Sequence, residues 1–396
     1  MNAAKRKPRL SRTAEQVLQQ IRAWILEHHL EPGSRLPSER DLAGRLEVSQ
    51  RQVRAAVEQL QTEGLIQPVS ERIRMVAPDG AGPTAVFANS VVIFSTVQFS
   101  TMASGRDPRN MTELSFLGAA HAVQQAGLNF LALHPNQMTL PKVQALLREP
   151  PLGVVMTEEM LAQGTAWAEV LRLIEAASVP VAVHGDALAD PALAQTRFDT
   201  VHADHRQGTR DLCRRLLAKG CRRLLRCWDS RLLRQQPHWL AERDAGYEEA
   251  CREAGLPVLP PVPMAGVEVP GDNLTADDFA LERRAALGML YDAVRESPAA
   301  EPLGLVLATD AQVAPVTAAC RALGREPGRD VWVAGFDDYW HADSRRRFEP
   351  APPLATVNKH EDILGRGMVE LLRDRLAQRL GPAPVRRTFP VEVIDR

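Results

Sequence analysis

Several residue types and motifs that mark common protein classes are scarce in this chain of 396 residues. It has five cysteines, an odd number without a CxxC pair, which indicates reduced, mostly buried thiols in a cytoplasm rather than a disulfide framework. No apolar run approaches the roughly 18 residues of a membrane span. The basic N-terminus is not followed by an apolar segment of signal-peptide length. We therefore expect a cytoplasmic protein with no membrane partner.

Catalytic signatures are also missing. The sequence has no GxSxG elbow, Walker sequence or HExxH pair. His202, Asp204 and His205 are close in sequence, but on a strand and turn they do not form a good metal-ligand set. Only five lysines are present, none in the context of a Schiff-base lysine: Lys5, Lys7, Lys142, Lys219 and Lys359. We therefore predict no enzyme activity, no cofactor and no metal. An enzyme with turnover at Asp310 or Asp337 remains an alternative.

The charge is distributed unevenly along the chain. The formal net charge is -1, but residues 1–78 carry +4 and the remainder carries -5. A basic N-terminal part suits a partner with a phosphate backbone. Five basic residues at the start are consistent with a phosphate-binding arm or with an ordinary disordered terminus: Lys5, Arg6, Lys7, Arg9 and Arg12.

Residues 32–66 hold the pattern that says most about function. Ser38 caps a short helix with Asp41 at the capping-box position, and Ser49 caps the next helix after a three-residue break. Apolar residues recur at helical spacing on one side of each segment. Three residues at the start of the second helix lie away from its apolar side: Gln50, Arg51 and Arg54. A recognition helix presents side chains to base edges and phosphates from these positions. The alternative is a small helical bundle with a solvated charged face.

A family resemblance rests on these residues. Residues 32–42, PGSRLPSERDL, are followed at the family's spacing by Val48, Ser49, Val53, Arg54, Leu60, Glu63, Gly64, Leu65 and Ile66. The run resembles the GntR-family winged helix-turn-helix over residues 11–78. The resemblance implies double-stranded operator DNA as partner and DNA contacts from Arg40, Ser49, Arg51 and Arg54.

The sequence departs from that family in two places. Gln50 stands where members usually carry arginine, and the glycine-bearing wing tip is replaced by Ser70, Glu71 and Arg72. We keep Gln50 and Arg72 among the predicted DNA contacts, with the contact from the wing to the minor groove in question.

From residue 90 onward, short apolar runs alternate with helical patterns, which predicts parallel sheets with helices on both faces. Two halves of similar size imply a cleft, and ligands of such sheets bind beyond the carboxyl ends of the strands. We expect a small α/β winged helix-turn-helix domain at 1–78, a linker at 79–89 and a two-lobed α/β domain with doubly wound sheets at 90–396. Its first lobe covers about 90–203 and 356–384, and its second about 204–355 and 385–396.

The second part resembles the effector domain of the LacI family, which is related to periplasmic sugar-binding proteins. The resemblance is weak over the first hundred residues of this part and good afterwards, with an apparent insertion around 341–347. The residues on which this resemblance rests are Gln207 to Arg210, Leu217 to Gly220, Arg243, Gly246, Tyr247, Ala308 to Asp310, Gly335 to Asp338 and Pro352 to Val357. The resemblance implies a sugar-responsive regulator in which a small-molecule effector, a sugar or a derivative, binds between the lobes.

Candidate effector ligands lie where strands end. Asp337 follows a strand and can accept two sugar hydroxyls, or else it caps the next segment. Arg243 lies early in a helix instead, and it offers a guanidinium fork to vicinal hydroxyls, unless it pairs with a neighbouring acid. Thr309 and Asp310 end another strand, and Asp310 is equally suited to cap a helix at 311. Weaker candidates from two further strand ends are Asp204, Gln207, Thr96, Gln98 and Phe99.

These features together predict a ligand-responsive transcription regulator. We expect a repressor that binds a pseudo-palindromic operator as a homodimer and is allosterically controlled by a sugar. The alternative is a cytoplasmic solute-binding receptor without DNA function. The helical DNA-reading pattern favours the regulator.

Overall fold

The computed structural model describes residues 12–28, 30, 33–62, 65–68, 74–76, 89–97, 111–134, 138–148, 150–157, 165–185, 198–265, 274–298 and 301–396. The chain forms two compact units. The first contains Met1–Val91 with Ala145–Leu152, and the second contains Val92–Gln144 with Gly153–Arg396. Within the described part of the chain, every helix is too short or too polar to cross a bilayer.

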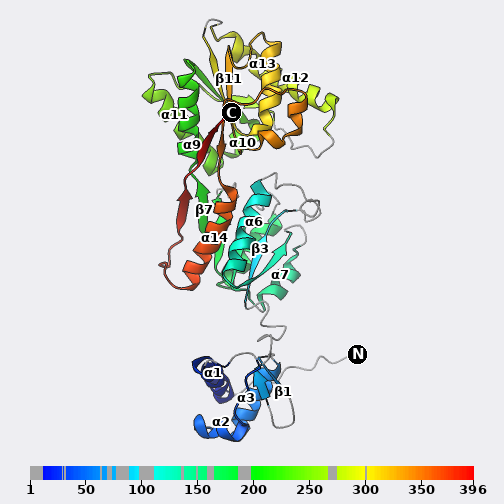
Figure 1. The fold of residues 1–396 in the computed structure, drawn as a ribbon, viewed down its shortest axis with the longest axis vertical. Coiled ribbons are helices and arrows are strands. Elements are labelled where there is room, and N and C mark those ends of the chain that lie inside the picture. Colours follow the sequence, from blue (N-terminus) through cyan, green and yellow to red (C-terminus); the bar gives the residue numbers. More distant parts are fainter. Residues whose placement is uncertain are drawn as a thin grey trace. The chain divides into compact units, whose positions relative to one another are not determined.

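The N-terminal segment is a helical domain with a two-stranded sheet (Figure 1). Its elements are α1 (Arg12–Glu27), α2 (Glu39–Arg45), α3 (Gln50–Thr62), β1 (Ile66–Pro68) and β2 (Arg74–Val76). The strands are antiparallel, and a further bridge joins Arg35 to Met75. Apolar side chains from all five elements form one core, including Ile21, Leu42 and Leu60. The expected winged helix-turn-helix fold is confirmed, while the wing tip at 70–72 lies outside the described residues.

Local hydrogen bonds explain where α2 and α3 begin. The Ser38 Oγ accepts from the Asp41 backbone N–H at 3.2 Å and donates to the Asp41 carboxylate at 2.7 Å. At Ser49, the backbone N–H and Oγ both donate to Gln52 Oε1, and the Gln52 N–H returns a bond to Ser49 Oγ. Each cap satisfies backbone donors that the first helical turn leaves open. Both predicted helix starts are therefore present.

The second unit is built on two six-stranded sheets. The first has the order β13-β7-β6-β5-β3-β4, with β3 (Ser90–Phe94), β4 (Asn129–Leu133), β5 (Gly153–Met156), β6 (Val181–His184), β7 (Asp199–Ala203) and β13 (Arg386–Phe389). The second has the order β14-β12-β11-β10-β8-β9, with β8 (Arg223–Asp229), β9 (Val262–Met264), β10 (Leu303–Leu307), β11 (Val331–Phe336), β12 (Ala355–Asn358) and β14 (Glu392–Asp395). We call the two sheets with their helices the first and second lobes.

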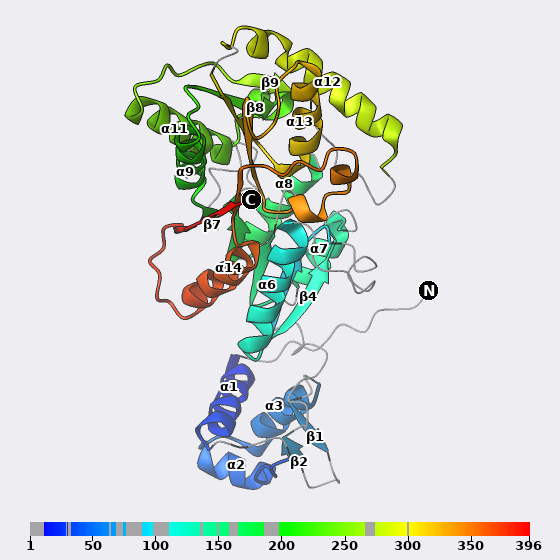
Figure 2. The same cartoon turned by 45° about the horizontal axis from the view of Figure 1, so that its top comes forward.

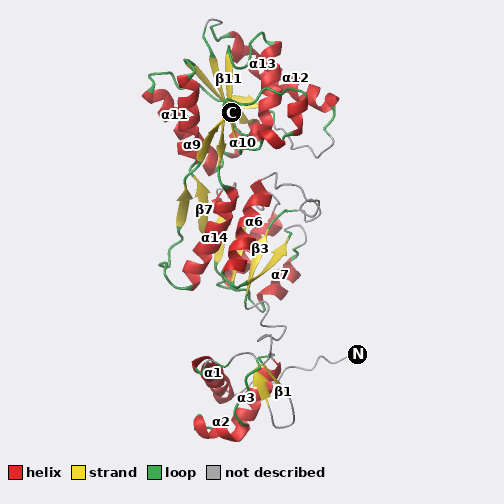
Figure 3. Ribbon diagram, in the orientation of Figure 1, coloured by secondary structure: helices red, strands yellow, loops and turns green. Residues whose placement is uncertain are grey.

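Helices cover both faces of the sheets, as the alternating pattern predicted. The first lobe has α6 (Met111–Gln125), α7 (Leu140–Leu147), α8 (Thr165–Ala176) and α14 (Glu361–Leu376). The second has α9 (His205–Ala218), α10 (Ser230–Gln235), α11 (His238–Glu253), α12 (Ala276–Arg295), α13 (Val313–Ala322) and short 3₁₀ turns at Asp310–Gln312, Trp340–Ala342 and Ser344–Arg347. Figures 1 and 3 show α9 and α11 on one side of the second sheet and α12 and α13 on the other.

The chain crosses between the lobes at other residues than expected. The expected first-lobe segment 356–384 begins inside β12, which pairs with β11 of the second sheet. The expected second-lobe segment 385–396 includes β13, which pairs with β7 of the first sheet. Only β14, antiparallel to β12, returns to the second lobe. The true crossings follow residue 358 and residue 389, because backbone pairing rather than apolar pattern decides which sheet β12 and β13 join.

Two glycines let α6 and α14 pack closely, side by side in Figure 2. A Cβ atom on Gly118 would stand 2.0 Å from the Asp362 carbonyl oxygen, and one on Gly365 would stand 2.0 Å from the Ser115 carbonyl oxygen. Such distances exclude any side chain, so the backbones meet directly. This contact fixes the N-terminus of α14, and with it the end of the crossing from β12.

All five cysteines are free and buried, as expected. Burial raises the pKa of the Cys221 thiol to about 11 and raises that of Cys213 further. The thiols stay protonated at neutral pH and serve as small apolar side chains.

Candidate functional site

The start of α3 presents a polar, basic surface. Gln50, Arg51 and Arg54 are exposed, while Val53 and Leu60 of the same helix are buried in the core. The Arg54 guanidinium lies 3.1 Å from the Glu39 carboxylate of α2, which orients it along the junction of the two helices. The structure therefore leaves these three residues on the exposed side of α3, as their spacing predicted.

The remaining predicted DNA contacts are partly described. Arg40, on the first turn of α2, is exposed. Ser49 is exposed and is engaged in the α3 cap, so its hydroxyl has a structural role in addition to any DNA contact. Arg72 lies outside the described residues.

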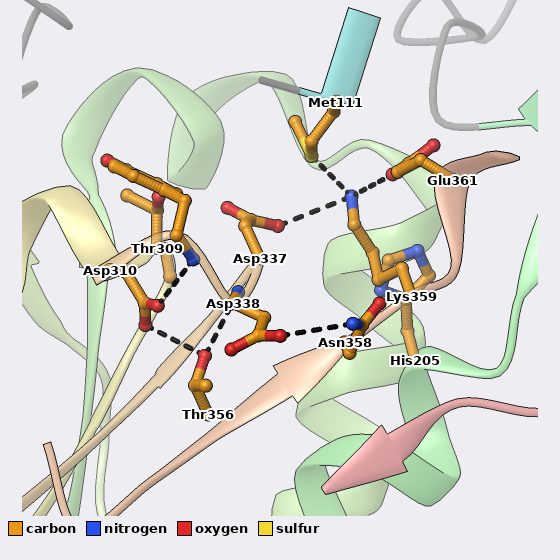
Figure 4. A network of polar contacts seen from close by, with 12 residues as sticks. Met111, His205, Thr309, Asp310, Asp337, Asp338, Thr356, Asn358, Lys359 and Glu361 are labelled. Carbon is orange, nitrogen blue, oxygen red and sulfur yellow. Dashed lines mark hydrogen bonds and ion pairs between the residues drawn. The ribbon is translucent and has the colours of Figure 1, made fainter. Parts of the chain in front are cut away.

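In the second unit, polar groups gather beyond the carboxyl ends of β10, β11 and β12 (Figure 4). Asp337 directly follows β11 and has a φ of 89°, and Asp338 has a φ of 50°. Two successive non-glycine residues in the left-handed region are strained, and such strain is concentrated at functional sites. The Asp337 carboxylate is buried and lies 3.3 Å from the Lys359 ammonium. Its Oδ1 accepts no hydrogen bond within the described part of the chain.

Asp310 organises the loop after β11. Its Oδ2 accepts from the backbone N–H groups of Tyr339 and Trp340, and its Oδ1 accepts from the Thr356 hydroxyl at 2.9 Å. The residue is fully buried, and a Cβ atom on Gly335 would meet its Oδ1 at 2.2 Å. Burial and the Asp337 charge raise the pKa of Asp310 to about 8. This geometry favours a supporting role under Asp337, whereas the sequence left a ligand contact and a helix cap equally open.

Arg243 is held by neutral partners rather than by the acids next to it in sequence. Its Nη1 donates to the Ala308 carbonyl at 2.7 Å and its Nε donates to His205 Nδ1 at 3.2 Å. The guanidinium lies between two aromatic rings, 4.5 Å from the centroid of Trp239 and 3.7 Å from that of Phe336. These contacts hold the fork at the carboxyl ends of β10 and β11, beside Asp337.

The other candidates occupy the edges of this region. Asp204 caps α9, where its carboxylate accepts from the Gln207 N–H at 2.9 Å, and its neighbour His205 contacts Arg243. The Thr309 hydroxyl accepts from the Ala311 N–H and so caps the 3₁₀ turn that Asp310 begins. Thr96 is half-buried just beyond β3. Gln98 and Phe99 lie outside the described residues.

One buried charged residue of this region was not among the sequence candidates. Lys359 follows β12, and its ammonium lies 2.9 Å from Glu361 Oε1 and 3.3 Å from Asp337 Oδ1. The second oxygen of Glu361 lies 2.8 Å from Nε2 of His184, at the end of β6. Asp337, Lys359, Glu361 and His184 therefore form a continuous charged group, which we call the Lys359 cluster.

Two known families match this chain. "Bacterial regulatory proteins, gntR family" matches residues 13–72, and "Periplasmic binding protein-like domain" matches residues 213–396. The chain joins a gntR-type DNA-binding domain to a periplasmic-binding-protein-like domain. The two resemblances predicted from sequence are thereby confirmed, and the second match begins at residue 213.

Individual proteins are similar to all or part of this chain. The HTH-type transcriptional regulator CelR of Thermobifida fusca is 27% identical over 205 residues, 52% of this chain and 52% of that protein. The match thus spans about half of this curated relative. Among solved structures, a transcriptional regulator CelR–cellobiose complex has a TM-score of 0.54 at 19% identity, covering 88% of this chain and 89% of the other. A LacI family regulator from Enterococcus faecium with bound ribose has a TM-score of 0.53 at 14% identity, covering 78% and 97%. At these identities the structures establish the fold of the binding-protein-like domain.

A signal for the Lys359 cluster was present in the sequence of the binding-protein-like domain. Lys359 and His184 each come at the end of an apolar strand, as does Asp337, which the same rule selected. Glu361 stands on the first turn of α14, a helix that the sequence pattern did not resolve as a separate element. The pairing of Lys359 with Glu361 depends on a crossing between lobes, which no local pattern predicts.

Proposed function

We propose that this chain is a DNA-binding transcription regulator whose binding-protein-like domain binds a sugar or sugar-like metabolite, and that this ligand changes the affinity of the gntR-type domain for DNA. The observation that carries the proposal is the presence in one chain of an exposed basic start of α3 and a buried array of carboxylate and guanidinium groups at strand ends. The first suits phosphates and base edges. The second suits vicinal hydroxyls, because carboxylates and guanidinium forks make charge-assisted hydrogen bonds to them.

The relatives support the same class of function. The curated relative is named a transcriptional regulator, and the two solved structures carry cellobiose and ribose by their titles. Both are neutral carbohydrates with several hydroxyls. Asp337 and Arg243 are the residues that we propose contact such a ligand first, with Thr309, Asp204, Gln207 and Thr96 around them. The Arg243 position between Trp239 and Phe336 adds an aromatic surface for an apolar sugar face.

The proposal also covers the oligomeric state of the protein and the sign of regulation. The chain acts as a cytoplasmic homodimer and a repressor, and it binds a pseudo-palindromic operator whose half-sites match the two-fold axis of the dimer. It carries out no catalysis, and neither matched family is a catalytic one. Gln50, Arg51 and Arg54 read the bases, while Arg40 and Ser49 contact the backbone.

Two assays on the full-length protein test the proposal. Selection from a random duplex library is expected to enrich one sequence with related half-sites. A thermal-shift screen with ribose, glucose and cellobiose is expected to raise the melting temperature for at least one of them, since a ligand that binds the folded state stabilises it. Sugar stabilisation without sequence enrichment would instead support a solute-binding receptor. Chemical conversion of the stabilising sugar would indicate an enzyme.

A further inference from the structure

The Lys359 cluster lies where the chain passes from the second lobe to the first. Lys359 follows β12 and precedes α14, and its ammonium contacts Asp337 of the second lobe and Glu361 of the first. It also lies 2.7 Å from the sulfur of Met111, at the start of α6. Figure 4 shows the Asp337 and Glu361 carboxylates on opposite sides of the ammonium. One cation is thus shared between two carboxylates from different lobes.

All members of the cluster are removed from water. The exposed fractions of the side chains are 7% for Asp337, 3% for Lys359 and 6% for Glu361, and 5% for His184. Buried charges are strongly destabilising unless they are paired. The Lys359 ammonium supplies this pairing for the carboxylates of both Asp337 and Glu361.

Two buried carboxylates share one cation here. The Lys359 ammonium contacts both Asp337 and Glu361, and the second oxygen of Glu361 lies against His184. Asp338 adds no net charge because it pairs with Arg396. Asp310, with its raised pKa, holds a proton at neutral pH and adds none. A phosphate or carboxylate on the ligand would bring an unmatched negative charge next to two buried carboxylates.

We propose that Lys359 and Glu361 determine the charge preference of the effector site, so that it selects neutral polyhydroxyl ligands and rejects their phosphorylated forms. This inference rests on the proposed function, in which Asp337 is a ligand contact. Glu361 has the larger effect on this preference, because it neutralises the positive charge of Lys359 that would otherwise attract a phosphate. Lys359 in turn orients the Asp337 carboxylate through its contact with Oδ1.

The test compares three variants of the full-length protein with the wild type. Glu361→Gln preserves the size of the side chain and a contact to His184 but leaves Lys359 with one carboxylate. Lys359→Gln with Glu361→Gln removes one charge of each sign. Glu370→Gln is the matched control, since it makes the same charge change at an exposed position on the same helix. The probes are inorganic phosphate, glucose, glucose 6-phosphate, ribose and ribose 5-phosphate, followed by calorimetry and thermal shift at constant ionic strength.

The expected result is selective. Wild type and Glu370→Gln are not stabilised by inorganic phosphate, and no phosphate ester binds them more tightly than its parent sugar. Glu361→Gln gains about 10-fold or more in affinity for inorganic phosphate, and the double variant loses this gain. Tighter binding of a phosphate ester than of its parent sugar to the wild type would overturn the inference, as would a folded Glu361→Gln that gains no phosphate affinity. If Glu361→Gln does not fold, the wild type decides the inference, by whether a phosphate ester binds it more tightly than the parent sugar does.

The outcome is separable from that of the proposed function. If no sugar stabilises the wild type, the sugar-binding proposal fails for these ligands, but the gain of inorganic phosphate binding by Glu361→Gln still decides the role of the charge pair. If a sugar phosphate is the preferred ligand, the regulator proposal stands and the charge inference fails.

Discussion

Asp310 shows how a single residue can support a site without being exposed to it. Its carboxyl group holds the loop of Tyr339 and Trp340 and the Thr356 hydroxyl, and Gly335 leaves room for it. Because the folded protein holds the Asp310 proton up to a pH of about 8, while the unfolded chain releases it near pH 4, folding stability falls as pH rises through that window. Below the window, both states are protonated and this cost vanishes.

Asp310→Asn mimics the protonated carboxyl and should remove this loss. We expect the variant to fold and to lose less stability than the wild type between pH 5 and pH 8. The measurement is the urea midpoint of each protein at both pH values. Equal losses for the two proteins would mean that Asp310 does not change ionisation on folding.

At the proposed DNA-binding surface, substitution of Arg51 and Arg54 is expected to have the largest effect on DNA affinity. Replacing both by alanine should weaken binding to the selected DNA by about 100-fold or more, because phosphate and base contacts are lost together. Binding of a stabilising sugar should not change. The control replaces Arg329 and Arg379, exposed arginines of the other unit, by alanine. Undiminished DNA affinity in the Arg51/Arg54 variant would exclude α3 as the recognition helix.

At the scale of elements, the α6–α14 contact is the most constrained feature of the first lobe. Gly365→Ala should lower the free energy of unfolding by about 1–3 kcal/mol, as overpacking does, because its Cβ would meet a backbone oxygen. Gly288→Ala is the matched control on α12, where nothing lies within 4 Å, and it should stabilise the protein by about 0.5–1 kcal/mol. Chemical denaturation measures both. Equal effects of the two substitutions would show that α6 and α14 do not pack as described.

The same scale shows what the sequence can predict. Helix and strand positions followed from apolar periodicity and from caps such as Ser38 and Ser49, which act over three residues. The strand-end rule selected Asp337, whereas Arg243 was selected on a helix, by the family resemblance and its guanidinium chemistry. The rule was not extended to Lys359. The residues of β13 were expected in the second lobe, whereas this strand pairs with β7 of the first sheet. Both depend on pairings between segments more than a hundred residues apart, such as Lys359 with Met111 and β13 with β7. Local pattern carries no information about these pairings.

At the scale of the whole molecule, the proposed function links DNA binding and sugar binding in one chain. A ligand can change DNA binding only if it prefers one of two states of the protein, and the coupling must then act equally in both directions. The Lys359 cluster offers such a preference, since it joins residues of both lobes beside the proposed ligand contact Asp337. Typical couplings change affinity by about 5- to 150-fold.

The most direct measurement is the affinity of the selected DNA for the full-length protein with and without the stabilising sugar, by fluorescence anisotropy. We predict that saturating sugar weakens DNA binding by at least about 5-fold, as expected for a repressor that is released by its ligand. Asp337→Ala, which leaves Lys359 paired with Glu361, should bind DNA as the wild type does and show no response to the sugar. DNA affinity that is unchanged by a sugar known to bind the wild type would contradict the account.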